Sequence, residues 1–255
     1  MKTTITVPPG GAFFEGHFPG RPILPGVVEL LLVIDALARE SGRPVVLRGI
    51  AFARLRQLVL PGDHLDLVTQ ELDHRHIRFD LSREGVVVAN GELVPGRPEE
   101  PVSAASAIGR AAGSITSAPP LDALLPQRPP MRFVTSIVGE TADRLDCAAC
   151  VPAACGLVGA GSAHVLAGVE AAAQAAATWE AVRRWREGNV AVPRVGYLVA
   201  LRDVVFFAER IPADRSFAAS VRLEAAAPPL THYLFEVSQD GMLLARGMIA
   251  TFLAA

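Results

Sequence analysis

The stretch FFEGHFPGRPILPGVVELLLVIDAL, residues 13–37, decides the fold of this chain. A turn rich in Gly and Pro, which contains His17, runs directly into a segment that is apolar on almost every side. Pro25 is typical of a helix start, and Gly42 is typical of a C-terminal cap. The pattern therefore predicts a helix from about Pro25 to Ser41 that is buried on most of its sides.

The second half of the chain repeats this arrangement. Residues 165–187 form a second apolar segment, and strand-like segments follow both helices. The two sets of strands correspond in detail, as in LPGD and IPAD (60–63 and 211–214), and in GVVVANG and GMLLARG (85–91 and 241–247). The repeat predicts two copies of a unit made of one buried helix and about five antiparallel strands.

Residues 95–120 separate the two copies. They are rich in Pro, Gly, Ala and Ser and have no strong period, which is typical of a linker. We therefore expect an α+β fold with one domain at 1–94 and another at 121–255. Each is a long antiparallel sheet wrapped around its central helix, and the two pair as a duplicated dimer would. The alternation of HIRFDL at 76–81 predicts one of the half-exposed strands.

Composition excludes several classes of protein. Hydrophobic residues make up 51% of the chain and charged residues 20%, which suits folded domains rather than disorder. The formal net charge of −2 gives no reason to expect nucleic-acid binding. The N-terminus lacks the apolar core of a signal peptide, and Glu29 and Asp35 interrupt the most apolar helix, so we expect no membrane span. These features predict a soluble, cytoplasmic protein.

Cys147, Cys150 and Cys155 are too few for a disulfide framework. Their spacing allows a zinc site with His164 as a fourth ligand. The favoured interpretation is that the cysteines are small residues on a strand and in the loop after it. His74 and His76, on one face of a predicted strand, are interpreted in the same way, as part of a solvated surface.

The twelve residues GHFPGRPILPGV, 16–27, resemble the active-site motif of hot-dog-fold 3-hydroxyacyl-ACP dehydratases. In the second half, LPQRPPM (125–131) resembles the entry segment of that family, and GVEAAAQA (168–175) resembles its central helix. The pairing is similar to a fusion of the two dehydratase partners of aryl polyene pathways. The resemblance implies a double hot-dog fold and dehydration of a 3-hydroxyacyl thioester to the trans-2-enoyl form in fatty-acid or polyene-type polyketide synthesis.

In this family the catalytic acid lies on the central helix fourteen residues after the histidine. Counting from His17 gives Leu31, which carries no proton to transfer. Glu29 lies about 200° around the helix from Leu31, and Asp35 lies about 6 Å further along the axis. By this counting the first half has a base and no acid, and Glu29 faces away from the site.

The second half has the reverse defect. Glu170 lies in the family's helix pattern with Gln174 one turn later, but Gly156 stands fourteen residues before it in place of a histidine. Hot-dog dehydratases take the histidine and the carboxylate of one site from different protomers. The resemblance therefore implies one composite site made of His17 and Glu170. The related position, with Leu31, should be inactive, and Gly156→His with Leu31→Glu should create a second site.

The resemblance also implies roles for these groups. His17 is the base that removes the α-proton, and Glu170 is the acid that protonates the leaving hydroxyl. The backbone N–H of Gly26, at the start of the helix, is placed to hold the enolate oxygen. Further substrate-binding residues implied by the motif are Phe18, Pro25, Val27 and Gln174.

No metal or redox cofactor is implied. The acyl group is expected to arrive on the phosphopantetheine arm of an acyl carrier protein. Because carrier proteins are acidic, Arg21, Arg54 and Arg56 are candidates for the docking surface. Whether the pseudo-dimer forms a larger homo-oligomer is left open.

Other functions fit the same fold, because fold does not fix chemistry. One alternative is an acyl-thioesterase, which needs a carboxylate or water-activating cluster that the sequence does not place. Another is an enoyl-CoA hydratase, which carries its acid and histidine close together in one segment, unlike this chain. The third is a non-catalytic acyl-binding partner in a synthase complex.

Overall fold

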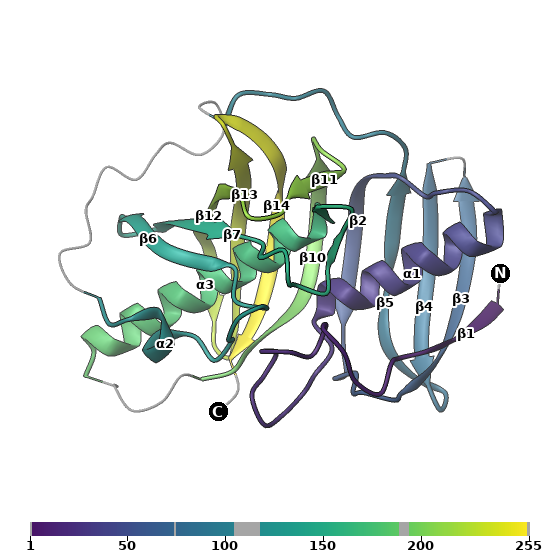
Figure 1. Ribbon diagram of the computed structural model, residues 1–255, viewed down its shortest axis with the longest axis horizontal. Coiled ribbons are helices and arrows are strands. Elements are labelled where there is room, and N and C mark those ends of the chain that lie inside the picture. Colours follow the sequence, from purple (N-terminus) through teal and green to yellow (C-terminus); the bar gives the residue numbers. More distant parts are fainter. Residues whose placement is uncertain (1, 74, 105–117, 189–193, 254–255) are drawn as a thin grey trace.

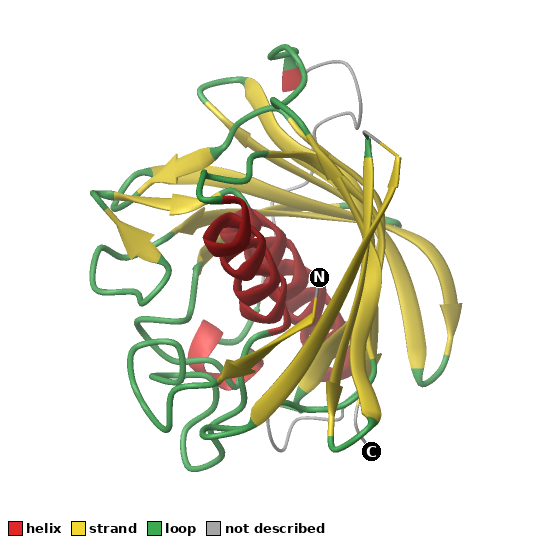
Figure 2. Cartoon of the chain, turned by 90° about the vertical axis from the view of Figure 1, so that its right-hand side faces the viewer, coloured by secondary structure: helices red, strands yellow, loops and turns green. Residues whose placement is uncertain are grey.

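The computed structural model describes residues 2–73, 75–104, 118–188 and 194–253 (Figure 1). Within these residues, one sheet of eleven antiparallel strands curves around two long helices (Figure 2). The first half contains β1 (Lys2–Thr6), α1 (Gly26–Ser41), β2 (Leu47–Leu55), β3 (His64–Asp73), β4 (His76–Arg83) and β5 (Val86–Pro95). The second half contains α2 (Leu121–Leu124), β6 (Val134–Glu140), β7 (Arg144–Cys150), β8 (Val158–Gly159), β9 (Ser162–His164), α3 (Leu166–Arg186), β10 (Gly196–Phe206), β11 (Arg210–Pro212), β12 (Ser216–Ala227), β13 (Leu230–Gln239) and β14 (Met242–Leu253).

Helix α1 forms as its sequence predicts. It begins directly after Pro25 and ends at Ser41, and Gly42 adopts the left-handed conformation, with φ of 66°, that is typical of a C-terminal cap. Its apolar side lies in the hollow of the sheet, where the burial of each large side chain contributes roughly 1.5–3 kcal/mol to folding. The buried apolar residues of α1 are Val27, Val28, Leu30, Val33, Ile34 and Ala36. The second predicted helix also forms, as α3.

The strand order shows that the chain is a fused pair of similar units. The large sheet has the order β1-β3-β4-β5-β2-β10-β14-β13-β12-β7-β6. The two units meet where β2 pairs with β10, and the strands on either side follow in mirrored order. Segments 85–91 and 241–247, which correspond in sequence, both contribute to the strand next to this seam, β5 and β14. The expected double hot-dog architecture is therefore confirmed.

The seam between β2 and β10 requires a very close approach of the two backbones. Strand β10 is irregular between Arg202 and Val205, and Asp203 has a positive φ of 50°. At this irregularity, Val204 lies against Gly49 of β2. A Cβ atom on Gly49 would lie 2.2 Å from the Val204 carbonyl oxygen. Only glycine fits at this point of the seam.

The predicted linker lies partly outside the described residues, which omit 105–117, and the domain boundaries stay predictions. The flanking residues that are described run along the second half. The N–H of Glu99 donates to the carbonyl of Phe206 at 2.9 Å, and the N–H of Leu243 donates to the carbonyl of Val102 at 2.9 Å. The chain that leaves the first unit is thus attached to the second.

The cysteines lie where the strand-and-loop interpretation placed them, with Cys147 and Cys150 in β7 and Cys155 in the loop after it. In the described ranges, no three His, Cys, Asp or Glu side chains are grouped so that they could hold a metal ion. Across the same ranges, no helix has the length and apolar character that a bilayer crossing requires.

Candidate active site

His17 lies in the turn before α1 and is held in one orientation. Its ring is only 8% exposed, and Nδ1 lies 2.8 Å from the carbonyl oxygen of Ile23. A carbonyl can only accept, so Nδ1 carries the proton of the neutral ring and Nε2 is left as an acceptor. The N–H of Ile23 in turn donates to the carbonyl of His17 at 2.9 Å, and the ring of Phe18 stacks on the imidazole at 4.1 Å. The turn therefore presents a basic nitrogen in a fixed direction.

Glu170 lies in the first turns of α3 and is 4% exposed. The side chain of Gln174, one turn later, donates from Nε2 to Glu170 Oε1 at 3.1 Å and to the carbonyl of Met131 at 2.8 Å. The Gln174 Oε1 accepts from the backbone N–H groups of Phe133, at 2.7 Å, and of Val134, at 3.3 Å. These bonds fix the amide, which in turn fixes Glu170 through one of its two oxygens.

His17 and Glu170 line one cavity of about 800 Å³ between the two halves of the chain. The first half contributes the start of α1, the last residue of β2 (Leu55) and residues 56–58 after it. The second half contributes the ends of β10 and β14 and one face of α3. The lining residues of α3 recur every three or four positions, and they are Glu170, Ala173, Ala177, Glu180 and Arg184. The structure thus places His17 and Glu170, the two residues of the expected composite site, in the lining of the same cavity.

Gly26 also lines this cavity, as expected. It is the first residue of α1, so its N–H has no partner within the helix. A Cβ atom here would lie 2.3 Å from Cδ1 of Leu55, so the glycine allows the Leu55 side chain to pack against the helix start.

The other four expected substrate contacts are not among the residues that line the cavity. Phe18 stacks on the ring of His17, and Gln174 holds Glu170. The Pro25 carbonyl accepts the N–H of Val28 at the helix start, while Val27 is fully buried in the core. Contact of these four residues with a substrate stays a prediction.

The prediction that Glu29 faces away from the site is wrong, because Glu29 lines the cavity together with His17. The side chain is 3% exposed, its Oε2 has no hydrogen-bond partner among the described residues, and burial raises the pKa of its carboxyl well above the ordinary value. Glu29 and Leu31 lie on different sides of α1, as the rotation of about 200° predicts. The cavity lies on the side that carries Glu29. Leu31 packs against the core, and Asp35 is exposed. A lone glutamate in an otherwise apolar helix turn was the available signal.

The second, symmetry-related position is closed by packing. A Cβ atom on Gly156 would lie 2.8 Å from the backbone of Ala12 and 2.9 Å from the backbone nitrogen of Phe13. Histidine does not fit at this point without moving the backbone. The expectation that Gly156→His with Leu31→Glu would create a second site is therefore wrong.

The three candidate docking arginines occupy different places. Arg56 lines the cavity, whereas Arg54 lies over the ring of Phe52 at 5.4 Å and borders a separate hollow. Arg21 is exposed and lies outside the cavity lining. Sequence reasoning missed Arg184 and Arg194, which both line the cavity.

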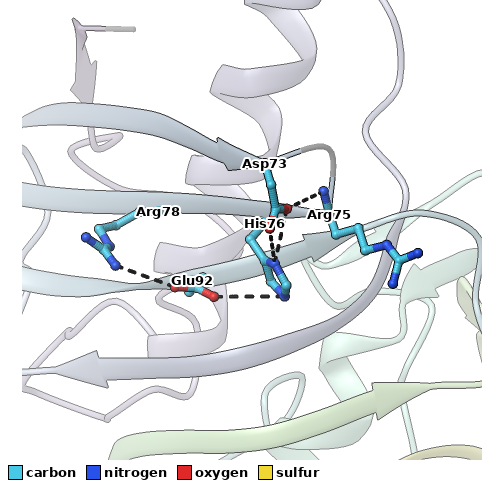
Figure 3. Close-up of polar contacts among 5 residues, drawn as sticks. All are labelled: Asp73, Arg75, His76, Arg78 and Glu92. Atoms are coloured by element: carbon cyan, nitrogen blue, oxygen red, sulfur yellow. Dashed lines mark hydrogen bonds and ion pairs between the residues drawn. The ribbon is translucent and has the colours of Figure 1, made fainter.

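The remaining histidine prediction concerns the surface of the first half. His74 lies outside the described residues. His76 belongs to a group of charged side chains on β3, β4 and β5 (Figure 3), with its Nδ1 3.2 Å from Asp73 and its Nε2 4.0 Å from Glu92. These contacts, with His76 and Asp73 partly exposed, fit a solvated surface.

Comparison with known families divides the chain into the same two parts. Residues 1–92 match the ApeI-like family, described as ApeI dehydratase. Residues 119–255, more than half of the chain, match the ApeP-like family, described as ApeP dehydratase.

Individual relatives point the same way. The chain is 39% identical over 98 residues to the 3-hydroxyacyl-[acyl-carrier-protein] dehydratase FabZ of Syntrophobacter fumaroxidans, which covers 32% of this chain and 64% of that protein. The chain spans about three fifths of the length of the curated relatives that it matches first.

Two solved structures share the fold. A trans-AT PKS dehydratase domain from Brevibacillus brevis superposes with a TM-score of 0.75 at 15% identity, covering 100% of this chain and 94% of that domain. The dehydratase heterocomplex ApeI:P from Xenorhabdus doucetiae gives 0.50 at 18% identity, covering 55% of this chain and 93% of the other.

Proposed function

The chain belongs to the ApeP-like dehydratase family and carries an ApeI-like dehydratase unit in front of it, and from this premise we propose that it dehydrates a 3-hydroxyacyl thioester on an acyl carrier protein. The product is the trans-2-enoyl thioester, in fatty-acid or polyene-type polyketide synthesis. The observation that carries the proposal is that His17 and Glu170, from different halves, line one cavity.

The proposed reaction needs a base, an acid and a site for negative charge. His17 removes the α-proton with Nε2, because its Nδ1 is engaged with Ile23. As the thioester oxygen becomes negative, it accepts a hydrogen bond from the N–H of Gly26 at the positive end of α1. Glu170 gives its proton to the 3-hydroxyl, which leaves as water. One C–H and one C–O bond break, and one carbon–carbon double bond forms.

An arginine pair in the cavity supports a carrier-bound substrate. Arg184 lies fourteen residues after Glu170 on the same face of α3, which is about 21 Å along the helix. Its Nε is enclosed and has no hydrogen-bond partner among the described residues. Burial, and then the charge of Arg194, lowers the pKa of Arg184, while the charge of Glu180 opposes this shift. Both arginines line the cavity, where they offer positive charge to an anion.

The length of the phosphopantetheine arm fits the distance of about 21 Å along α3 between Glu170 and Arg184. The arm has about thirteen bonds from phosphorus to sulfur, and about three more lead to carbon 3 of the acyl group, which gives roughly 20 Å at about 1.2 Å per bond. We place the phosphate of the arm between Arg184 and Arg194, with carbon 3 near Glu170. The cytoplasmic location and any larger homo-oligomer stay predictions.

Intact-mass analysis of 3-hydroxyacyl carrier protein incubated with the purified chain tests the proposal. The native chain should remove one water, and His17→Ala and Glu170→Gln should each slow this by about 100- to 10,000-fold. Exposed His64→Ala and Glu40→Gln serve as matched controls and should retain the native rate. A pantetheine thioester without the phosphate should react with a lower kcat/KM.

Each other outcome points to a specific alternative. Water loss that survives Glu170→Gln would move the acid to another residue, with Glu29 the first to test. Release of the free acyl group would indicate a thioesterase. Binding of the carrier protein without any mass change would indicate a non-catalytic partner.

A further inference from the structure

The proposed catalytic cavity contains two buried polar side chains that the proposed dehydration does not use. Glu29 and Gln127 both line it, and they are 3% and 5% exposed. Each has an enclosed oxygen, Glu29 Oε2 and Gln127 Oε1, without a hydrogen-bond partner among the described residues. Because enclosed polar atoms in folded proteins are nearly always hydrogen-bonded, two such atoms in one cavity indicate that a bound molecule supplies the partner.

Gln127 lies beside the turn that carries His17. The next residue, Arg128, donates its N–H to the carbonyl of Gly16 at 3.0 Å. The contact is so close that a Cβ atom on Gly16 would lie 2.0 Å from the Arg128 carbonyl oxygen. Gln127 is therefore held at the same end of the cavity as the proposed base.

Glu29 is at this end as well. It lies three residues, or about 4.5 Å, beyond Gly26 along α1. Figure 1 shows the N-terminal ends of α1 and α3 near the middle of the molecule, while the C-terminal end of α3 extends toward the periphery. Glu29 belongs to the first turn of α1, whereas Arg184 belongs to the last turn of α3, about 21 Å along that helix from Glu170.

The two side chains offer complementary hydrogen bonds. Burial raises the pKa of Glu29 well above the ordinary value and so favours the protonated carboxyl, which can donate. The Gln127 Oε1 can only accept. A hydroxyl group satisfies both side chains at once, because it donates one hydrogen bond and accepts another.

We propose that Glu29 and Gln127 form a specificity subsite for a hydroxyl group on the acyl chain, beyond the reacting carbon atoms. This inference rests on the proposed function, because the thioester oxygen must be anchored at Gly26. From that anchor, carbon 5 of the chain is four bonds, about 5 Å, from the thioester carbon. This is close to the rise of about 4.5 Å between Gly26 and Glu29 along α1, so we place the hydroxyl of a 5-hydroxyacyl group at the subsite.

The test is calorimetric binding of two unreactive probes to the full chain. Both are amide analogues of acyl-phosphopantetheine without a 3-hydroxyl group, one with an octanoyl chain and one with a 5-hydroxyoctanoyl chain. The native chain should bind the hydroxylated probe at least about fivefold more tightly. Glu29→Leu and Gln127→Leu should each abolish this preference, and Glu29→Gln, which can still donate, should retain part of it. Glu40→Leu, the same change at an exposed position of α1, is the matched control.

Equal binding of the two probes by the native chain would overturn the subsite and would indicate that water satisfies both oxygens. A preference that persists in both leucine variants would also overturn it. Because the probes cannot be dehydrated, their binding is independent of the reaction. A native chain that prefers the hydroxylated probe but removes no water from 3-hydroxyacyl carrier protein would contradict the proposed function alone.

Discussion

At the scale of single residues, burial shifts the pKa of some titratable groups, as it does at Glu29 and His164. His164, at the end of β9, is an example outside the proposed catalytic cavity. Burial, and then the charge of Arg210, lowers its pKa to about 4 from an ordinary value of 6.5. Its Nδ1 accepts the N–H of Leu166 at 3.2 Å, so the neutral ring completes the start of α3.

His164 should therefore make stability depend on pH. As the pH falls from 6.5 toward 4, the unfolded chain binds a proton at this residue and the folded chain does not. The stability that is present above pH 6.5 is lost over this window. In His164→Asn, whose side-chain oxygen can still accept from Leu166, this loss should be absent. Urea unfolding at several pH values measures it.

The comparison needs a control for the loss of a histidine, and His64→Asn at an exposed position provides one. Wild type and His64→Asn should lose stability with the same slope below pH 6.5, and His164→Asn should have a smaller slope. Equal slopes in all three proteins would show that His164 does not titrate differently in the folded chain.

At the scale of elements, Gln174 connects α3 to the segment that leads into β6. Its amide bonds the backbone of Met131, Phe133 and Val134 and the carboxyl of Glu170. The same side chain therefore joins two elements and orients the proposed acid.

Gln174→Leu should lower stability by about 2–4 kcal/mol, because it leaves several enclosed backbone groups without partners. It should also lower kcat more than it changes KM, since Glu170 loses its support while the cavity wall is retained. Urea unfolding and dehydration kinetics measure the two effects. Gln70→Leu on exposed β3 should change neither, and a stable Gln174→Leu with native kcat would show that the contact is dispensable.

Much of this element-scale structure is predictable from local sequence. The Pro-Gly start and the Gly42 end of α1 are local signals, and the alternation at 76–81 is that of a strand with one buried face, β4. The positions of His17 and Glu170 follow from motif spacing. Glu29 was missed because helical rotation gives only the relative directions of side chains. The position of the cavity around α1 depends on β10 and α3, and both of these elements begin more than 120 residues after α1 ends.

The closed second position was missed for a related reason. Ala12 and Phe13 fill the space beside Gly156, and the sequence around Gly156 does not predict this contact. Similarly, an arginine-rich chain does not reveal which of its arginines share a cavity. Local patterns determine elements, whereas long-range packing determines which residues meet.

At the scale of the whole molecule, the seam between β2 and β10 joins the two units into one sheet. Gly49→Ala would place a methyl group on the Val204 carbonyl, which is backbone and cannot rotate away. We expect a loss of about 1–3 kcal/mol in unfolding free energy from this overpacking. Gly10→Ala, where nothing lies within 4 Å, should stay within about 0.5 kcal/mol of wild type. Calorimetric unfolding of the three proteins distinguishes these cases, and a native-like Gly49→Ala would show that the seam can widen.

The same seam determines how the site responds to dilution. When a base and an acid belong to separate chains, the fraction of assembled sites falls as the chains are diluted. Here the hydrogen-bonded strands and the covalent chain keep His17 and Glu170 in one molecule, so their meeting is an intramolecular event. The proposed catalytic pair therefore forms by folding and not by encounter, and we expect the activity per folded chain to be independent of dilution.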